Sequence, residues 1–362
     1  MRNALIPFIL FGLSTPSLGQ GFAPADGRAG FLTVLPVYGS WSDGAVTISQ
    51  FSTAVILEYP LSRVMAVSLH AGESNTGGDV TDLNGFTDTQ VSLSYRVEPA
   101  NILLTIGVNA PTGKRSFSSE EFETDTLMSK EVFDFRVPRY GQGLNVHPAA
   151  VWAIPLNPQL VIGIGGGFHY MGVFTPLQDY GDYDPGDEWM LSGGIEVSLD
   201  EASRLSADVS LTTYGTDKFE GMEIYQAGDK ISTALGYQRY FEYDELVVVA
   251  RYRTRMDGQI SLGNAIVTEF NKANPDMFDL SGKFRHRLSS QFALGFLLQM
   301  RSFQETGPAL SGVTLFGAAV QPEYAISQAV QVIGTAEYQR GELKTDSALT
   351  GWEIGAGLRV RF

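Results

Sequence analysis

The sequence contains no cysteine. This absence excludes a disulfide framework, and it also excludes an N-terminal lipid anchor, which requires a cysteine. A chain of 362 residues without disulfides must be held together by burial and by backbone hydrogen bonds.

Long apolar runs are missing as well. Beyond the N-terminus, no run approaches the roughly 18 consecutive apolar residues that a membrane-spanning helix needs, and the mean hydropathy is close to zero, at −0.01. A transmembrane β-barrel would leave no such run, because its lipid-facing and lumen-facing residues alternate along each strand.

Basic residues and histidines are few. The 25 Lys and Arg against 40 Asp and Glu give a net charge of −15, which argues against nucleic acid as a partner. Four histidines offer little material for a nucleophilic triad. The glycine-rich stretches at residues 107–114 and 163–168 do not match nucleotide-binding motifs. We therefore expect no enzyme activity and no cofactor.

The first nineteen residues have the composition of a secretory signal peptide. Arg2 precedes an apolar stretch at residues 4–13, and small residues follow at Ser17 and Gly19. The sequence predicts a signal peptide at residues 1–19 and one domain at residues 20–362.

The stretch LVVVARYRTRM, residues 246–256, shows the pattern that organises the whole chain. Leu246 and Val248 share one parity with Ala250 and Tyr252, whereas three arginines share the other parity. Successive side chains of a strand point to opposite faces, so one face of this strand is apolar and the other is cationic.

Most of the other apolar segments repeat this alternation, and together they predict about sixteen strands (range 12–16). The expected strands are residues 31–41, 51–61, 64–71, 87–97, 101–110, 144–156, 160–174, 189–199, 203–214, 230–241, 246–256, 278–288, 291–303, 313–326, 329–340 and 352–362.

The connections between these strands are alternately short and long. An up-and-down barrel with short periplasmic turns and long extracellular loops produces this alternation. We predict an all-β fold, a transmembrane antiparallel up-and-down barrel in the bacterial outer membrane, surrounded by its lipids. Only residues 20–30 precede the first strand, so no plug domain is expected.

The last strand ends on Phe362, with Val360 two residues earlier. This ending resembles the terminal insertion signal of bacterial outer-membrane proteins. The resemblance implies recognition by the barrel assembly machinery.

Cations gather on one parity of three consecutive strands, which are neighbours in an up-and-down barrel. The predicted pore-lining basic wall consists of Arg251, Arg253, Arg255, Lys283, Arg285, Arg287 and Arg301. Rows of charge set pore selectivity, so the wall suggests a transverse field in a water-filled pore or a path for anions. The alternative is an interior filled with salt bridges that passes nothing.

The longest expected loop, residues 114–143, mixes acids with aromatic residues. A connection of this length is usually functional or disordered. We predict that it folds into the barrel mouth and narrows the pore, the alternative being a mobile extracellular loop. The candidate constriction residues are Phe117, Glu120, Glu121, Phe122, Phe133 and Phe135.

A second loop, residues 178–188, carries five acids and no base. Clustered carboxylates can hold Ca²⁺. The spacing does not match an EF-hand, however, and solvated negative surface is the preferred interpretation. No metal site is predicted.

Residues 85–114 resemble a segment of the outer-membrane proteins associated with the meta-pathway of phenol degradation, which are related to the FadL-type channels. The matching residues are Gly85, Asp88, Tyr95, Pro111, Thr112 and Gly113. The resemblance implies passage of small hydrophobic or aromatic molecules.

Together these patterns predict an outer-membrane channel for passive or facilitated uptake of small solutes, either hydrophobic and aromatic compounds or organic anions. The alternative is a structural or adhesive barrel with a blocked lumen.

Overall fold

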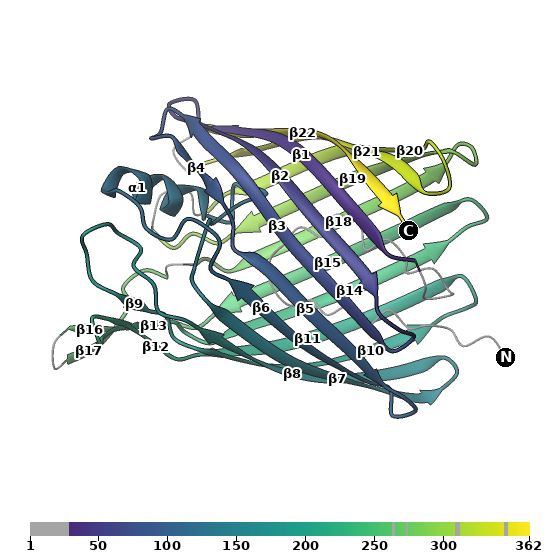
Figure 1. Cartoon of the computed structure of the whole chain (residues 1–362), viewed down its shortest axis with the longest axis horizontal. Helices are drawn as coiled ribbons and strands as arrows, with labels where there is room; N and C mark the ends of the chain where they lie inside the picture. The colour runs from purple at the N-terminus through teal and green to yellow at the C-terminus, as the bar shows by residue number, and fades with distance from the viewer. Residues whose placement is uncertain (1–28, 263–264, 273, 308–311, 344–346) are drawn as a thin grey trace.

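The computed structural model describes residues 29–362 except 263–264, 273, 308–311 and 344–346. The predicted signal peptide therefore lies outside the described residues. The chain forms a closed barrel of sixteen antiparallel strands (Figure 1), which confirms the predicted fold class. The first and last strands pair and close the sheet, with Phe31 opposite Arg361.

The barrel strands are β1 (Phe31–Ser42), β2 (Thr47–Pro60), β3 (Met65–Gly78), β5 (Thr89–Val97), β6 (Ile102–Ala110), β7 (Asn145–Asn157), β8 (Leu160–Met171), β10 (Glu188–Ser198), β11 (Ser203–Tyr214), β14 (Lys230–Tyr240), β15 (Asp244–Arg255), β18 (Met277–Arg287), β19 (Phe292–Phe303), β20 (Thr314–Ala325), β21 (Val330–Glu342) and β22 (Ala348–Arg361). Each pairs with its sequence neighbour among them, as an up-and-down barrel requires.

Short turns gather at one end of the barrel and long loops at the other (Figure 1). The C-terminus lies at the end with the short turns, which is the periplasmic end in such barrels. Several strands are longer than predicted. β2 begins at Thr47, β3 continues to Gly78, and β22 begins at Ala348, because pairing extends the sheet beyond the apolar zone into the extracellular space.

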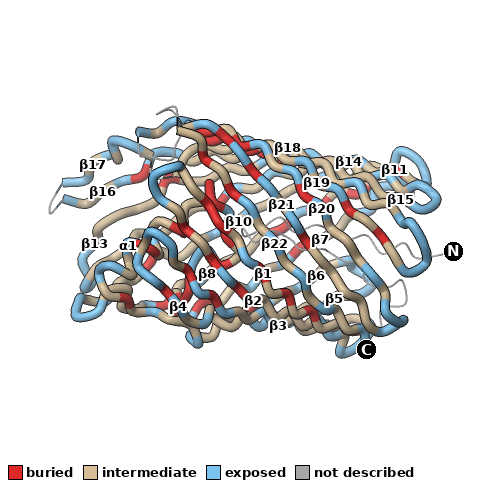
Figure 2. The backbone as a smooth tube through the Cα atoms, turned by 90° about the horizontal axis from the view of Figure 1, so that it is seen from above, coloured by how far each residue is buried: buried red, intermediate tan, exposed pale blue. Residues whose placement is uncertain are grey.

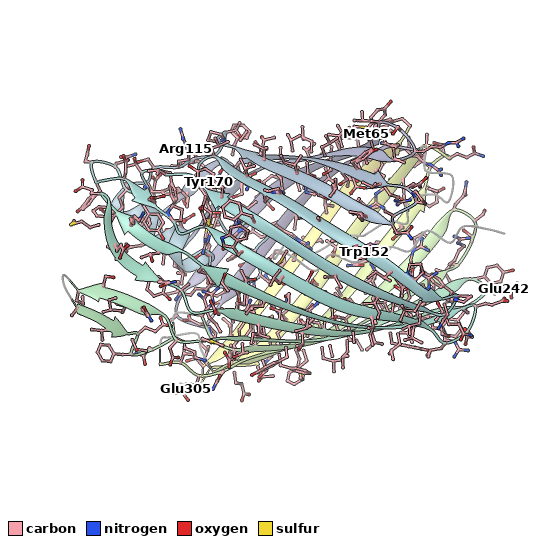
Figure 3. All side chains as sticks on the ribbon, turned by 90° about the horizontal axis from the view of Figure 1, so that it is seen from below. Met65, Arg115, Trp152, Tyr170, Glu242 and Glu305 are labelled. Carbon is pink, nitrogen blue, oxygen red and sulfur yellow. The ribbon has the colours of Figure 1, made fainter. Side chains whose placement is uncertain are left out.

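The predicted alternation of faces is present in the barrel wall. On β5, Val91 and Tyr95 are exposed on the outer surface by 39% and 43%, and the serines between them lie on the inner face. Exposed and less exposed residues alternate along the strands in Figure 2. Trp152 and Tyr170, which are labelled in Figure 3, are 49% and 45% exposed. Apolar side chains thus cover the lipid-facing surface.

None of the helices in the described ranges is long and apolar enough to cross a membrane. The helix present there, α1 (Ser119–Met128), lies in the long connection between β6 and β7.

Two structures at the loop end were not predicted. β4 (Leu83–Phe86) pairs with the extended part of β3. A separate five-stranded sheet rises from the loops (Figure 1) and consists of β9 (Tyr183–Asp184), β12 (Thr216–Phe219), β13 (Met222–Gln226), β16 (Gln259–Leu262) and β17 (Ala265–Thr268). The acidic loop at residues 178–188 contributes β9 to this sheet, and Tyr183 donates to Asp217 over 2.6 Å.

The two faces of β11 give a direct test of orientation in the membrane. Val209, near the middle of the strand, is 49% exposed on the outer face. Val209→Arg would place a cation in the hydrocarbon layer and should reduce folding stability by about 2–4 kcal/mol. Ser210→Arg, the matched control on the inner face, should have a much smaller effect. Urea unfolding in lipid vesicles measures both, and equal losses would contradict the assignment of the faces.

Candidate functional site

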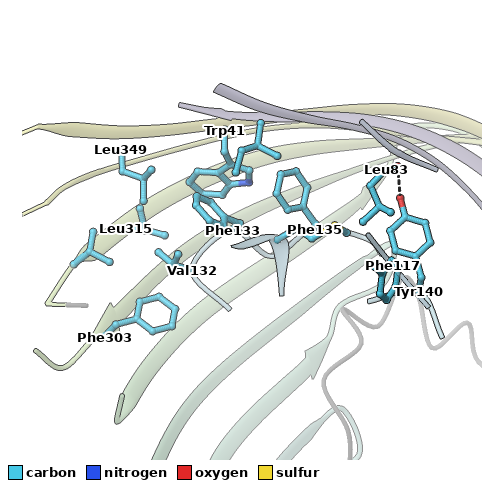
Figure 4. Packing of buried hydrophobic residues seen from close by; sticks show 13 residues of the cluster. Trp41, Leu83, Phe117, Val132, Phe133, Phe135, Tyr140, Phe303, Leu315 and Leu349 are labelled. Carbon is cyan, nitrogen blue, oxygen red and sulfur yellow. Dashed lines mark hydrogen bonds between the residues drawn. The ribbon is translucent and has the colours of Figure 1, made fainter. Parts of the chain in front are cut away.

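The connection between β6 and β7, residues 111–144, turns back into the barrel instead of extending away from it. We call it the inner loop. Its apolar side chains pack against those of the wall in one buried cluster (Figure 4). The cluster consists of Trp41, Ile48, Leu83, Phe117, Met128, Val132, Phe133, Phe135, Tyr140, Phe303, Val313, Leu315 and Leu349. The inner loop is therefore packed into the extracellular half of the barrel.

Asp88, which lies between β4 and β5, holds the two ends of the inner loop together. Its carboxylate accepts a hydrogen bond from the Gly113 amide over 2.9 Å and another from the Gln142 amide over 2.7 Å. A Cβ atom on Gly113 would come within 2.7 Å of the Asp88 nitrogen, so only glycine fits there. The adjacent Thr112 hydroxyl accepts from the Thr89 amide over 2.8 Å.

These contacts explain a large part of the motif at residues 85–114. Asp88, Thr112 and Gly113 come from its two halves, and they meet at the neck of the inner loop. Gly85 lies beside them, with φ of +159°, and a Cβ there would approach Lys114 at 3.1 Å. The motif thus fixes how the loop enters the barrel.

The helix α1 begins with a capping box. The Ser118 hydroxyl accepts from the Glu121 amide over 3.2 Å, and the Glu121 carboxylate accepts from the Ser118 amide over 3.1 Å. Glu121 also pairs with Lys114 at 2.6 Å. Burial raises the pKa of Glu121, but the bonds from Lys114 and Ser118 outweigh it and leave that pKa lowered. Two predicted constriction acids thus lie in the first turn of a helix, where Glu120 is exposed.

The segment after α1 is anchored to two distant parts of the wall. On β2, the buried Gln50 accepts from the Val137 amide over 3.0 Å and donates to the Val137 carbonyl over 2.8 Å. On β22, Glu353 forms a bidentate pair with Arg136, whose Nε lies 2.8 Å from the carboxylate. Burial opposes the charge of Arg136, yet its bond to Glu353 leaves its pKa raised.

Two residues of the predicted basic wall hold the opposite side of this segment. Arg253 on β15 forms a bidentate pair with Glu131 of the inner loop, with one bond of 2.6 Å. Arg301 on β19 is only 5% exposed. It donates to the Glu131 carbonyl over 3.1 Å and lies 3.4 Å from the carboxylate of Asp134.

The other residues of the predicted basic wall share its strands but have different neighbours. Arg251 lies directly opposite Asp279 in the sheet, and Arg285 pairs with Glu323 at 2.7 Å. Arg255 donates to the Tyr214 hydroxyl over 3.0 Å. Lys283 is partly buried between β15 and β19, and Arg287 is exposed at the periplasmic end of β18. Acids thus lie beside Arg251 and Arg285, and their negative charge reduces the positive field of the wall.

The four phenylalanines predicted for the constriction have two environments. Phe117, Phe133 and Phe135 belong to the buried cluster, and Phe122 packs against it. The sequence did not reveal two wall residues that contact the inner loop: Trp41 on β1, which meets Phe133, and Gln50 on β2, which binds Val137. Both lie at inward-facing positions of strands that are remote in sequence, and no local pattern distinguishes them.

A cavity of about 120 Å³ lies beside the inner loop. Trp41, Phe133 and Phe135 form its aromatic part. The polar lining comes mainly from the loop and from β19 to β22, and comprises Asp134, Arg136, Gln299, Gln321, Glu337, Gln339 and Glu353. This cavity is the candidate solute site.

No protein-family model matches the sequence, and no curated protein is detectably similar to it. Solved structures do share its fold. The monoaromatic hydrocarbon channel CymD is 10% identical, with a TM-score of 0.48 over 92% of this chain and 89% of that one. CdiB from Acinetobacter baumannii is 9% identical, with a TM-score of 0.51 over 91% and 60%.

An outer-membrane channel from Pseudomonas putida F1 is 10% identical, with a TM-score of 0.41 over 99% and 100%. At such identities the similarity concerns the barrel fold alone. The closed sheet and its apolar outer surface are, independently of these similarities, those of a transmembrane β-barrel. Membership of the FadL-related family is not established by these similarities.

The neck of the inner loop can be tested by proteolysis. Asp88→Ala removes the acceptor for Gly113 and Gln142, and the loop should become several-fold more sensitive to trypsin in the folded protein, for example at Arg115 and Arg139. Asp79→Ala is the matched control, because Asp79 accepts from the Thr47 amide at another loop. Equal cleavage of both variants would contradict the role of Asp88.

Docking of α1 should also depend on pH. Burial raises the pKa of Asp125 to about 6, although Arg139 and the Tyr140 amide partly oppose the shift. Well below pH 4 this carboxyl is neutral whether docked or released. Between pH 4 and pH 6 its ionisation should weaken docking, by up to about 3 kcal/mol.

Hydrogen exchange of the α1 amides, corrected for the intrinsic effect of pH, measures this change. Protection should fall between pH 4 and pH 7 in the natural protein. It should stay level in Asp125→Asn, which has no ionisable group at that position. A parallel fall in both proteins would assign the effect to other groups.

Proposed function

We propose that the protein is an outer-membrane channel for small solutes and that the inner loop narrows its pore. The observation that carries the proposal is the anchoring of this loop to β2, β15, β19 and β22, across the interior of a sixteen-stranded barrel. Barrels of this size have an interior wide enough for an aqueous path. A loop fixed to the wall on several sides sets the width of that path.

The charged residues beside the loop provide the second part of the proposal. The basic wall from Arg251 to Arg301 and the acids that it contacts place opposite charges side by side along the lumen. In a narrow aqueous pore such charges orient polar solutes and set selectivity. Two phenylalanines of the constriction, Phe133 and Phe135, supply an apolar surface beside these charges.

The solute is proposed to be small and to carry apolar or aromatic surface. The aromatic part of the cavity supports this class, as does the resemblance of residues 85–114 to proteins that pass such compounds. Organic anions, the other predicted class, have less support, because acids pair with several cations of the wall.

A barrel with a blocked lumen remains the second candidate, and the packing of the inner loop favours it. The buried cluster contains side chains from β1, β2, β19, β20 and β22, as well as from the loop itself. In this case the protein would serve as a structural or adhesive barrel that presents its five-stranded sheet to the exterior.

The last strand is proposed to be the element that the barrel assembly machinery recognises. Phe362 is 54% exposed and stacks on Tyr59, with ring centroids 5.8 Å apart. Its amide bonds to the carbonyl of Gly30 over 3.0 Å at the closing seam of the barrel. An apolar residue at this end remains accessible to a partner in the periplasm.

Deletion of residues 117–135 tests the constriction. The deletion removes α1 and three cluster phenylalanines, so single-channel conductance in planar bilayers should rise at least twofold. Shortening the β12–β13 hairpin is the matched control, since that hairpin lies outside the barrel and should leave the conductance unchanged (Figure 1).

The same recordings separate the two candidate functions. A natural protein that conducts, together with a deletion variant that conducts more, supports a constricted channel. A silent natural protein whose deletion variant conducts supports the blocked barrel instead. Unchanged conductance after the deletion would exclude a narrowing role for the loop.

A further inference from the structure

The charges around the cavity beside the inner loop do not balance. Glu337 on β21 and Glu353 on β22 lie directly opposite each other in the sheet. Like charges at such a cross-strand position repel each other. Arg136 pairs with Glu353, and its Nε lies 2.8 Å from that carboxylate.

The second arginine near the cavity is also engaged elsewhere. Arg301 lies 3.4 Å from Asp134 and donates over 2.5 Å to the Oε1 of Gln339. The amide nitrogen of Gln339 in turn donates to Glu337 over 2.6 Å. Within the described residues, no Lys or Arg nitrogen forms a salt bridge with Glu337. With all groups ionised, the three carboxylates of Asp134, Glu337 and Glu353 face the two guanidinium groups of Arg136 and Arg301, which leaves one negative charge in excess at this cavity.

Aromatic rings border the same cavity. Trp41 meets Phe133 edge to face with centroids 5.8 Å apart, and Phe133 lies 5.8 Å from Phe135. A cation positioned over an aromatic face is attracted by the ring quadrupole, most strongly by tryptophan. Aromatic rings beside an uncompensated carboxylate form the usual environment for an organic ammonium group.

The size of the cavity restricts the ligand further. Its volume of about 120 Å³ is well below the roughly 300 Å³ at which pockets begin to hold drug-sized molecules. Gln299 and Gln321 line its polar side and can accept hydrogen bonds from a hydroxyl or an ammonium group.

We propose that this cavity binds a small alkylammonium ion, with Glu337 as the counter-ion and Trp41 and Phe133 as the apolar contact. The inference rests on the proposed function and specifies its solute class, since a site at the constriction would retain this solute on its passage. The ligand differs from the organic anions that the basic wall alone suggests.

Equilibrium binding to the purified protein in detergent is the first test, and choline and 3,3-dimethylbutan-1-ol are the probes. The two molecules have nearly the same shape, and only choline carries a charge. We expect saturable binding of choline, measured by saturation-transfer NMR, and at least tenfold weaker binding of the neutral analogue.

Glu337→Gln keeps an acceptor for Gln339 and removes the charge, so it should weaken choline binding by about tenfold. Glu196→Gln is the matched control. Glu196 also faces the lumen, but it lies on β10, 3.7 Å from Arg204 on β11, and neither strand lines the cavity. Trp41→Phe, a second variant, should weaken choline binding less than Glu337→Gln. Heat-dependent mobility on gels verifies that each variant is folded.

Equal binding of choline and its analogue, or unchanged choline binding in Glu337→Gln, would overturn the inference. Uptake of choline, its analogue and arabinose into liposomes then tests the ammonium site and the proposed channel function separately. Entry of arabinose without selective choline binding keeps the channel and rejects the ammonium site. Selective choline binding without entry of any solute keeps the site and rejects the channel.

Discussion

The structure depends on the pairing of β1 with β22. Inside a lipid bilayer no water is available to hydrogen-bond an open sheet edge, and each unpaired backbone group costs several kcal/mol. The pairing from Phe31 to Ser42 against the last strand removes both edges. The same pairing places both chain ends at one end of the barrel, with Phe31 opposite Arg361.

Closure also determines what the interior must do. Sixteen strands enclose more space than their own inward side chains fill. Here the inner loop occupies part of that space, and it brings Glu131, Asp134 and Arg136 to charged residues of the wall. The pairs form between elements that are far apart in sequence. The interior is therefore ordered by ion pairs together with the buried apolar cluster, whereas an apolar surface covers the outside.

The barrel could be predicted from the sequence because each membrane strand carries its own evidence. Residues 246–256 alternate between lipid and lumen without reference to any partner. The strand extensions could not be predicted in this way. β3 beyond Ala71 runs above the lipid, where neither face needs to be apolar, so the alternation disappears while the pairing continues.

For the candidate site, local sequence gave less information. The composition of the loop points to its four phenylalanines and two glutamates but does not show what they contact. The helix within it had a readable signal in Ser118 and Glu121, a capping box three residues apart. Gln50 and Glu337 had no such signal. Gln50 matters because it binds Val137 of the inner loop, and Glu337 matters because it lies opposite Glu353. Neither contact can be recognised without the three-dimensional structure.

Asp88 contacts both ends of the inner loop, through Gly113 and Gln142. The two ends of the loop are therefore held close together by Asp88, whatever residues lie between Gly113 and Gln142. Sequence changes between these two points do not alter the span that the chain must bridge from β6 to β7. The inner loop can therefore change in sequence or length during evolution while the strands that it connects keep the same pairing.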